Sequence, residues 1–503
     1  MKTKIQTMLT LFVTIALMWA PEVMAETTTA LKNLPAEVTL FKNVKVFNGQ
    51  DKKLLDVDVL VVGNMIKKIG KNLPSSGTYE LDVDTTTYKK VDVVTGPGDY
   101  QGYTVKVVDK VGEVQKKQVP VNVIDGGGRT LMPGIMDMHV HMSIYRPVGQ
   151  MRDELTALEI GALGAARMEN LLMSGITTVR DTCGASAHLQ RVVDKWGALA
   201  GPRVISSEAC ITQTGGHGDF RERADKNPKM YSGPTHWMES SIAYLADGPT
   251  EIRRAVRENM RNGASFIKIM STGGISSQFD PLHQIAYTPE EIRAAVATAE
   301  TYGTYVTVHG IAPEGTKNAI ENGAHMVEHG AGLDEETIKL MKEKGVWLVP
   351  SLYVLLGLEE EEAKITLDPP SYIKWKNTKD GLADALNLAV KYGVKMAYGT
   401  DFVAPAVSVQ ASDTSSLIEF KYWEEFMPPW QVLRLATGNA GEVAALSGKN
   451  LPYQEGGLGQ IKAGFYADMI LVDGNPTQDL SLMTNRDNFK VIMKDGKVYK
   501  NTL

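Results

Sequence analysis

The chain has 503 residues, of which 43% are hydrophobic and 22% are charged, and its formal net charge is -6. This is the composition of a globular protein long enough for more than one domain. The slightly acidic balance argues against a nucleic-acid-binding protein, because such proteins usually carry a basic face. A small molecule or a short peptide is therefore the expected partner.

The first 25 residues differ from the rest of the chain. Two lysines precede an apolar run over residues 8–20, and Ala25 ends a stretch of small or apolar residues typical of a cleavage site. The apolar run is shorter than the ~18 residues expected of a membrane-spanning helix. Segment 1–25 therefore predicts a cleaved secretory signal, with an exported protein, periplasmic or secreted, that has no membrane span after cleavage.

Residues 26–132 and 451–503 share one sequence style. Both are rich in Val, Thr, Asp and Lys with repeated alternation, which is typical of strands with one buried face. We expect the two chain ends to build one discontinuous β-sandwich. Within it, segment 78–120 contains further alternating runs and turn-like residues, and it predicts one or two inserted hairpins that form an interface or an exposed decoration.

Residues 133–450 alternate short apolar runs with amphipathic segments. One such segment begins Thr288-Pro-Glu-Glu, which places threonine at a helix cap, proline in the first turn and acidic residues beside it. Eight strand–helix units over roughly 300 residues predict an α/β fold of the TIM (β/α)8 barrel type. An open doubly wound sheet is disfavoured, because no Gly-x-Gly-x-x-Gly opens a helix after the first run. The runs are 134–141, 176–181, 204–209, 266–270, 305–309, 325–329, 346–351 and 395–401.

Residues able to bind a metal ion stand at the ends of most of these runs. Side chains two apart on a strand face the same side, so a His-x-His pair can share one ion. The carboxyl ends of barrel strands surround one opening, and imidazoles and carboxylates there predict a metal site. The residues are His139, His141, Asp181, Lys268, His309, His329 and Asp401.

Lys268 interrupts a run that is otherwise apolar on both faces. The residue alone allows three interpretations: an ammonium that reaches the barrel mouth, a Schiff-base nucleophile, or a lysine that carbon dioxide converts into a carbamate bridging two metal ions. The histidines at the neighbouring strand ends favour the carbamate, because nearby metal ions would stabilise that anion.

Two further pairs lie near the predicted barrel mouth. Arg180 and Asp181 are expected to form a structural ion pair there. Cys183 and Cys210, the only cysteines, follow predicted strands, and the sequence is compatible with a single disulfide or with two buried thiols.

The ordered set His-x-His, Lys, His, His, Asp resembles the binuclear amidohydrolase superfamily. The opening sequence LMPGIMDMHVH at 131–141 is similar to that of the family, and the likeness continues through GITTVRD at 175–181 and GTD at 399–401 to GQIKAGFYADMILVDGNP at 459–476. FIKIMSTGG at 266–274 and TGGHG at 214–218 look most like the branch of imidazolonepropionase-like metallopeptidases, which includes Xaa-Pro dipeptidases and ochratoxin-type amidases. Relatives often have His-Ala-His-Gly where this chain has His-Gly-Ile-Ala at 309–312, which puts a substrate contact in doubt.

The resemblance implies a ligand set and a reaction. His139, His141 and Asp401 would bind one divalent metal ion, His309 and His329 a second, and carboxylated Lys268 would bridge them, with Zn2+ as the expected metal. A metal-bridging hydroxide would attack the amide bond of a dipeptide or an N-acyl amino acid. Asp401 would accept its proton and pass it to the leaving amine, which is general acid–base work typically worth ~10²-fold to 10⁴-fold in rate.

Substrate contacts and rival functions complete the expectations. His217, in the glycine-rich loop after the third run, and Tyr231, in the same loop, are the predicted substrate-binding residues. The resemblance also implies a homo-oligomer. The alternatives are a lactam, lactone or organophosphate hydrolase on the same site, a metal-free Schiff-base lyase using Lys268, and a structural protein, which would not need a complete ligand set.

Overall fold

The computed structural model describes residues 37–75, 77–84, 87–94, 104–111, 114–144, 156–184, 186–221, 242–401 and 412–503. The predicted signal at 1–25 and the predicted substrate contact Tyr231 lie outside these residues. Across the described ranges, no helix is both long enough and apolar enough to span a membrane.

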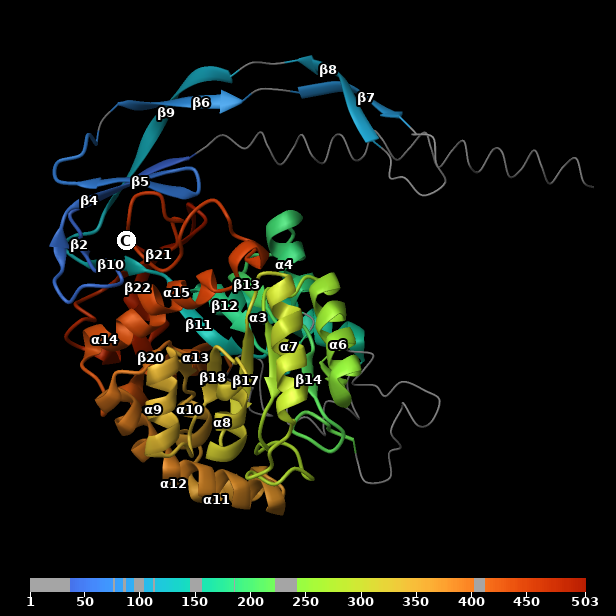
Figure 1. The fold of residues 1–503 in the computed structure, drawn as a ribbon. Coiled ribbons are helices and arrows are strands. Elements are labelled where there is room, and N and C mark those ends of the chain that lie inside the picture. The colour runs from blue at the N-terminus through green and yellow to red at the C-terminus, as the bar shows by residue number, and fades with distance from the viewer. Residues whose placement is uncertain are drawn as a thin grey trace, which may run out of the picture.

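All eight predicted runs contain a strand, and each strand pairs in parallel with a neighbour (Figure 1). The strands lie in two sheets, of order β11-β12-β13 and β15-β14-β16-β17-β18-β19-β20. Backbone hydrogen bonds join the sheets at both ends: Ser265 N donates to Ser206 O at 2.7 Å, and Asp401 N donates to His139 O at 2.8 Å. The bounds are β11 Ile135–Val140, β12 Ile176–Asp181, β13 Arg203–Ser206, β14 Cys210–Thr212, β15 Ala243–Leu245, β16 Ile267–Met270, β17 Val306–Gly310, β18 Met326–His329, β19 Trp347–Val349 and β20 Lys395–Met396.

Helices alternate with these strands and pack around them (Figure 1). The predicted start of α7 is confirmed: the Thr288 hydroxyl accepts from Glu291 N, and the Glu291 carboxylate accepts from Thr288 N at 2.8 Å. The helices are α3 Ala157–Met173, α4 Ala187–Gln190, α6 Gly248–Asn262, α7 Pro289–Thr301, α8 Pro313–Glu321, α9 Glu335–Lys344, α10 Tyr353–Leu356, α11 Glu360–Thr366, α12 Pro369–Tyr392, α13 Ser412–Trp423, α14 Pro429–Arg434 and α15 Ala440–Ala445. Short helical turns lie at Arg191–Lys195, Leu435–Asn439, Gly448–Asn450, Leu480–Thr484 and Arg486–Asn488.

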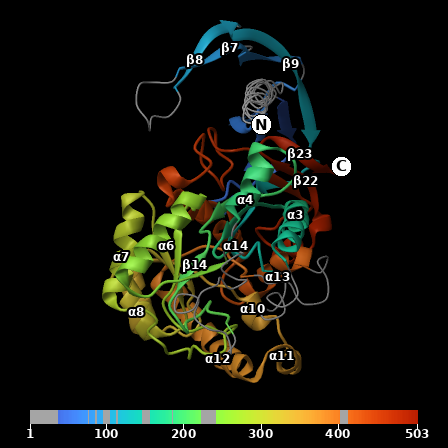
Figure 2. The same ribbon diagram turned by 90° about the vertical axis from the view of Figure 1, so that its right-hand side faces the viewer.

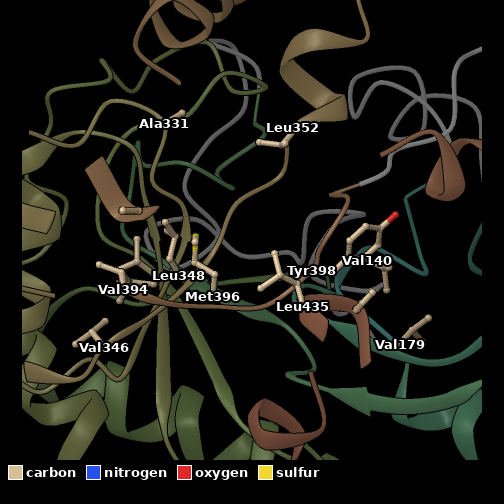
Figure 3. Close-up of a cluster of buried hydrophobic side chains, with 14 of the residues drawn as sticks. Val140, Val179, Ala331, Val346, Leu348, Leu352, Val394, Met396, Tyr398 and Leu435 are labelled. Atoms are coloured by element: carbon tan, nitrogen blue, oxygen red, sulfur yellow. The ribbon is translucent and has the colours of Figure 1, made fainter. Parts of the chain in front are cut away.

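The largest apolar core holds the strands against these helices. Val140, Val179 and Leu348 of the strands are buried in it together with Leu352 and Leu435 (Figure 3). Each fully buried aliphatic side chain of this size contributes roughly 1.5–3 kcal/mol relative to exposure. The packing therefore gives the strand ends a rigid frame.

The parallel strands and their helices form one body. Outside it, strands from both chain ends share one sheet, which we call the outer sheet. Its order is β23-β22-β21-β10-β2-β3, and β10, early in the chain, pairs antiparallel with β21, late in the chain. A second sheet has the order β5-β4-β1-β9-β6. Phe41 and Val59 of the second sheet pack with Leu471 and Val491 of the first in one apolar core. The bounds are β1 Val38–Lys42, β2 Lys45–Val46, β3 Leu55–Asp56, β4 Asp58–Val62, β5 Met65–Gly70, β9 Val114–Asp125, β10 Thr130–Pro133, β21 Met469–Val472, β22 Phe489–Lys494 and β23 Lys497–Asn501.

The segment 78–120 forms one hairpin, β7–β8, that lies in the chain between the two strands of a second antiparallel pair, β6 and β9. β6 (Thr78–Asp84) pairs antiparallel with β9, and β7 (Thr87–Val94) pairs antiparallel with β8 (Thr104–Val111). Figures 1 and 2 show these strands extending away from the helices as an arm. At the base of the arm, β9 pairs in parallel with β1 of the second sheet.

Arg203, the first residue of β13, connects the parallel-strand body to the outer sheet. Its guanidinium donates to Asp468 at 2.7 Å and to Asp495 at 2.6 Å. The Tyr453 and Tyr466 rings flank it, with centroids 4.7 and 4.0 Å away. Arg203 is only 2% exposed, so this is a buried ion pair between segments far apart in the chain.

Replacing this arginine tests the connection. Arg203→Met is expected to lower the free energy of unfolding by about 3–5 kcal/mol, because Asp468 would stay buried without its cation. Chemical denaturation measures the difference. The control is Arg261→Ala, which breaks an exposed pair with Glu258 and should change stability by less than about 0.5 kcal/mol. Equal effects of the two substitutions would contradict the role assigned to Arg203.

Candidate metal centre

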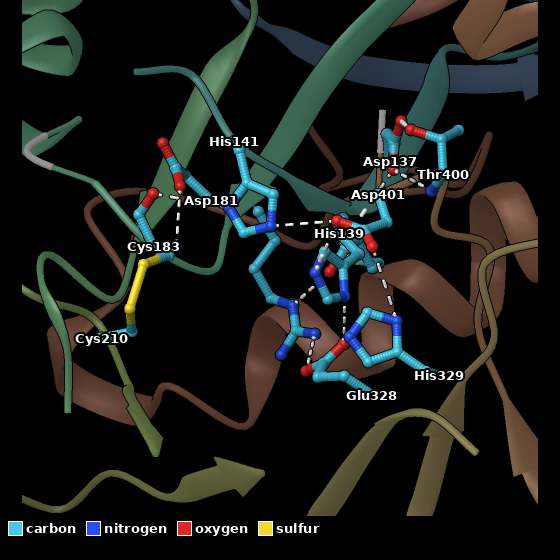
Figure 4. Close-up of polar contacts among 12 residues, drawn as sticks. Asp137, His139, His141, Asp181, Cys183, Cys210, Glu328, His329, Thr400 and Asp401 are labelled. Atoms are coloured by element: carbon cyan, nitrogen blue, oxygen red, sulfur yellow. Dashed lines mark hydrogen bonds and ion pairs between the residues drawn. A yellow bond between two sulfur atoms is a disulfide. The ribbon is translucent and has the colours of Figure 1, made fainter. Parts of the chain in front are cut away.

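Three of the predicted ligands meet beyond the carboxyl end of β11 (Figure 4). Asp401 Oδ1 lies 3.4 Å from His139 Nε2 and 3.0 Å from His141 Nε2. One ligand atom from each residue lies within 4.8 Å of the other two. His139 Nε2 is buried and has no hydrogen-bond partner among the described residues, so a metal ion would satisfy an otherwise orphaned nitrogen.

The backbone at two of the predicted ligands adopts an unusual conformation. Asp401 has φ 49° and His329 has φ 70°, both in the left-handed region that side chains rarely occupy. Such conformations cost about 1–3 kcal/mol each and persist where the surrounding structure holds them, often at functional sites. They aim the Asp401 and His329 side chains toward the same point, with His329 Nδ1 3.6 Å from Asp401 Oδ2.

The remaining histidines complete a compact group. The ring centroids of His309 and His329 are 4.5 Å apart, and those of His139 and His329 are 4.8 Å apart. Burial lowers the pKa of His139 to about 4, although Asp401 opposes the shift. Burial, with the neighbouring imidazoles, also lowers the pKa of His309 and of His329 well below the usual value. The imidazoles of His139, His309 and His329 are therefore neutral at neutral pH, which is the form that binds metal ions.

Charged side chains surround the imidazoles. Burial raises the pKa of Asp401, but His139, His141 and His329 outweigh that effect and hold it below its ordinary value. Lys268 on β16 is 1% exposed, and burial lowers its pKa to about 8. The positive charge of Lys268 also lowers the pKa of His139, His309 and His329.

Asp137, two residues before His139, is a site residue that the sequence did not predict. Its carboxylate accepts from Thr400 Oγ1 at 2.8 Å and from Thr400 N at 3.1 Å, and burial raises its pKa to about 7. The residue therefore ties the strand that carries the His-x-His pair to the segment that carries Asp401. In the sequence, an aspartate inside an otherwise apolar run was the signal that could have identified it.

The predicted pair of Arg180 with Asp181 is wrong, because Arg180 has a different partner. Arg180 pairs with the buried carboxylate of Glu328, whereas Asp181 accepts from Cys183 N and from Met142 N, each at 3.0 Å. Consecutive residues on a strand point to opposite sides, so the two side chains diverge. Burial raises the pKa of Glu328, but Arg180 and His139 more than offset it and leave the pKa below its ordinary value.

His217 stands beside the second group of predicted ligands. Its ring lies 4.2 Å from that of His309, centroid to centroid. The His217 Nδ1 atom lies 2.7 Å from Ser277 Oγ and 3.5 Å from Asp280 Oδ2, and Lys374 Nζ lies 3.1 Å from Asp280 Oδ1. These contacts hold the ring against the centre and leave Nε2 as the atom that can meet a ligand.

The two cysteines form a disulfide in the structure, which connects the segment after β12 to the start of β14 (Figure 4). The carbonyl of Cys183 also lies 3.4 Å from His141 Nδ1. The bridge therefore lies directly beside one of the predicted metal ligands.

The alternating parallel strands, with histidines and carboxylates gathered beyond their carboxyl ends, define an α/β protein with a candidate metal centre. Residues 130–499 match the model of the amidohydrolase family. The chain belongs to this family, whose members are generally metal-dependent, and the resemblance seen in the sequence is confirmed.

Relatives of known structure extend the likeness. Ochratoxinase from Aspergillus niger is 30% identical over 384 residues, which cover 74% of this chain and 75% of the relative. A prolidase crystallised with N-methylphosphonate-L-proline is 28% identical, with a TM-score of 0.75 over 92% of this chain and 100% of the other. A Xaa-Pro dipeptidase with bound methionine is 29% identical, with a TM-score of 0.72 over the same shares. The chain is a hydrolase that acts on amide or peptide C–N bonds.

Proposed function

We propose that this protein is an exported, binuclear metal-dependent amidohydrolase that cleaves the amide bond of a dipeptide or an N-acyl amino acid. The observation that carries the proposal is the buried His139 Nε2, which faces Asp401 beside His141 and has no hydrogen-bond partner among the described residues. The similarity to a prolidase and to a Xaa-Pro dipeptidase supports a dipeptide-like substrate.

The eight strands β11, β12, β13, β16, β17, β18, β19 and β20 are inferred to close into a (β/α)8 barrel. The backbone bonds Ser265 N to Ser206 O and Asp401 N to His139 O support closure, because they join the two parallel sheets at both junctions. In such a barrel the carboxyl ends of all strands surround one opening, where active sites lie. The outer sheet and its arm would then form the second, discontinuous domain.

Two divalent metal ions, with Zn2+ expected, fit the donor set. His139, His141 and Asp401 would hold one ion and His309 and His329 the other, since imidazoles and carboxylates are the ligands that zinc prefers. When bound, such a pair supplies an activated water and polarises the scissile carbonyl.

Lys268 is the proposed bridging ligand after reaction with carbon dioxide. Its neutral amine would form the new N–C bond to the carbon of carbon dioxide and release one proton to water, which leaves a carbamate anion. The lowered pKa of Lys268, about 8, increases the neutral fraction that can react. Burial of the side chain also favours a group that metal ions neutralise over an isolated ammonium.

Asp401 is the proposed proton carrier. Its carboxylate is ionised at neutral pH, because its pKa lies below the ordinary value. The side chain is 16% exposed, so it can reach both a reacting water and the substrate. An Asp401 carboxylate oxygen would accept a proton as the carbonyl is attacked and then give it to the leaving nitrogen.

His217 is the proposed substrate contact within the described residues. Asp280, held by Lys374, and Ser277 orient its ring beside His309. A hydrogen bond or a positive charge at Nε2 would suit the carboxylate of a dipeptide or N-acyl amino acid. Tyr231 stays the predicted second contact.

Export and assembly complete the proposal. The signal-like segment 1–25 supports a periplasmic or secreted location, and the Cys183–Cys210 disulfide suits an oxidising compartment. A homo-oligomer is expected from the family resemblance.

Metal content and substrate hydrolysis test the proposal directly. Protein purified without chelators is expected to contain about two equivalents of a divalent metal per chain and to hydrolyse members of a panel of dipeptides and N-acyl amino acids. Metal-free protein that forms a borohydride-trapped Schiff base at Lys268 would contradict the proposal. If the protein hydrolyses only lactams, lactones or organophosphates, the proposed metal site stands and the proposed dipeptide or N-acyl amino acid substrate is wrong.

Replacing the proton carrier separates metal binding from turnover. Asp401→Asn keeps an oxygen ligand but lowers basicity, so the variant should retain most of its metal while kcat falls by ~10²-fold to 10⁴-fold. Metal analysis and steady-state kinetics on the same sample measure both quantities. Near-normal kcat would rule out the proton-transfer role.

Removing the bridging lysine tests the carbamate. Lys268→Ala should lower metal occupancy and activity, and added short-chain carboxylates should restore part of both by occupying the bridging position. The matched control is Lys379→Ala, which alters a lysine of α12 that packs over the Trp375 ring and should leave metal content unchanged. Full occupancy and activity in Lys268→Ala would remove the bridging assignment.

A further inference from the structure

Glu328 lies directly behind one of the proposed metal ligands and does not belong to the ligand set. The residue is on β18, next to His329, and it is completely buried. Its Oε2 atom lies 2.8 Å from His139 Nδ1. Its Oε1 atom accepts from Arg180 and, at 2.5 Å, from Thr307 Oγ1. Both oxygens of the carboxylate are therefore engaged by side chains from different strands.

This arrangement determines where the proton on the His139 ring sits. An arginine side chain keeps its proton in proteins, and the ionised carboxylate paired with it can only accept hydrogen bonds. The His139 Nδ1 atom must then carry the hydrogen, which leaves the lone pair on Nε2. That Nε2 atom is the buried nitrogen 3.4 Å from Asp401 that has no hydrogen-bond partner among the described residues.

The other three histidines of the centre have weaker supports. His141 Nδ1 faces the Cys183 carbonyl at 3.4 Å, and His309 Nε2 faces the Gly273 carbonyl at 3.3 Å. His329 Nδ1 lies 3.6 Å from Asp401 Oδ2, and Asp401 is itself a proposed ligand. A carboxylate outside the ligand set that accepts from an imidazole makes the opposite nitrogen a stronger donor to a metal ion. Among the four proposed histidine ligands, His139 is the one whose Nδ1 contacts a carboxylate outside the ligand set, that of Glu328.

We propose that Glu328 is a positioning residue: held by Arg180 and Thr307, it keeps His139 in the tautomer whose Nε2 binds metal, and so sets the affinity of that ion. The inference rests on the proposed binuclear centre and adds a determinant that the ligand set does not contain. It also gives the buried Arg180 a role, because Arg180 decides which Glu328 oxygen faces His139.

The substitution Glu328→Gln is expected to reverse the hydrogen bond at His139 Nδ1. Arg180 has only donors, so it would hold the amide oxygen of the glutamine in the place of Oε1. The amide nitrogen would then face His139 Nδ1 and donate to it, which moves the ring hydrogen to Nε2. A protonated Nε2 cannot bind a metal ion. The affinity for one of the two ions should fall by roughly 10-fold to 100-fold, the range typical of lost support behind a ligand.

The test measures metal affinity and ligand geometry rather than turnover. Zn2+ dissociation constants are obtained by competition with a chromophoric chelator, and Co2+-loaded proteins give the visible absorption spectrum of the centre. Glu328→Gln is expected to show the weaker binding and an altered Co2+ spectrum. The control is Glu419→Gln, since Glu419 is equally buried but accepts from Leu352 N, Tyr353 N and Trp423 Nε1, and it should behave as wild type.

A double variant separates tautomer control from loss of packing. In Arg180→Met with Glu328→Gln the amide is free to turn its oxygen toward His139, so much of the lost affinity should return. A double variant no better than Glu328→Gln would overturn the proposal. If circular dichroism shows that the double variant does not fold, Glu328→Asp decides: its acceptor-only carboxylate should retain more affinity than glutamine, and the reverse order would overturn the proposal.

The outcomes also separate this inference from the proposed function. Wild-type affinity and an unchanged Co2+ spectrum in Glu328→Gln would overturn the positioning role alone. Wild-type protein that binds neither Zn2+ nor Co2+ would overturn the binuclear centre and the inference together.

Discussion

The hydrogen bonds between the first and the last parallel strands are the constraint on which the rest of the site depends. Asp401 N donates to His139 O, and Thr400 donates twice to Asp137. These bonds place an aspartate from one end of the body against a histidine pair from the other end. Without them, the Asp401 carboxylate and the two imidazoles would not lie close enough to bind one ion. The left-handed backbone at Asp401 is held by the same contacts.

Two buried ion pairs also hold the parallel strands in place. Glu328, with Arg180, stands behind His139 inside the parallel strands, and Arg203, with Asp468, joins those strands to the outer sheet. Isolated charges at such depths would be strongly unfavourable, but each of these carboxylates has an arginine partner and additional donors. The two arginines lie on adjacent strands, so the candidate metal centre and the contact with the outer sheet are built on the same pair of strands.

The residues around the opening of the candidate centre come from loops and a helix, whereas the predicted metal ligands stand at strand ends. His217, Asp280 and Lys374 come from loops and a helix, and their contacts run from the glycine-rich loop to α12. Loops of this kind vary most among enzymes that share a fold, which is how one metal centre serves different substrates. In the proposed function the strand ends would provide the groups for amide hydrolysis, whereas the loops would decide which substrate fits.

The strand positions and the order of the candidate ligands along the chain could be predicted from the amino-acid sequence. The positions of the eight strands follow from local apolar runs, the start of α7 follows from Thr288 and its neighbours, and the His-x-His pair follows from strand alternation, because all three depend on residues near one another in the chain. The same local reasoning failed for Arg180, which was assigned to its neighbour Asp181. Its actual partner, Glu328, is 148 residues away. Such pairings, like the Cys183–Cys210 bridge and the Asp280–Lys374 contact, follow from the folded arrangement of the chain. The partner of a buried charge or thiol depends on which strands and loops become neighbours after folding.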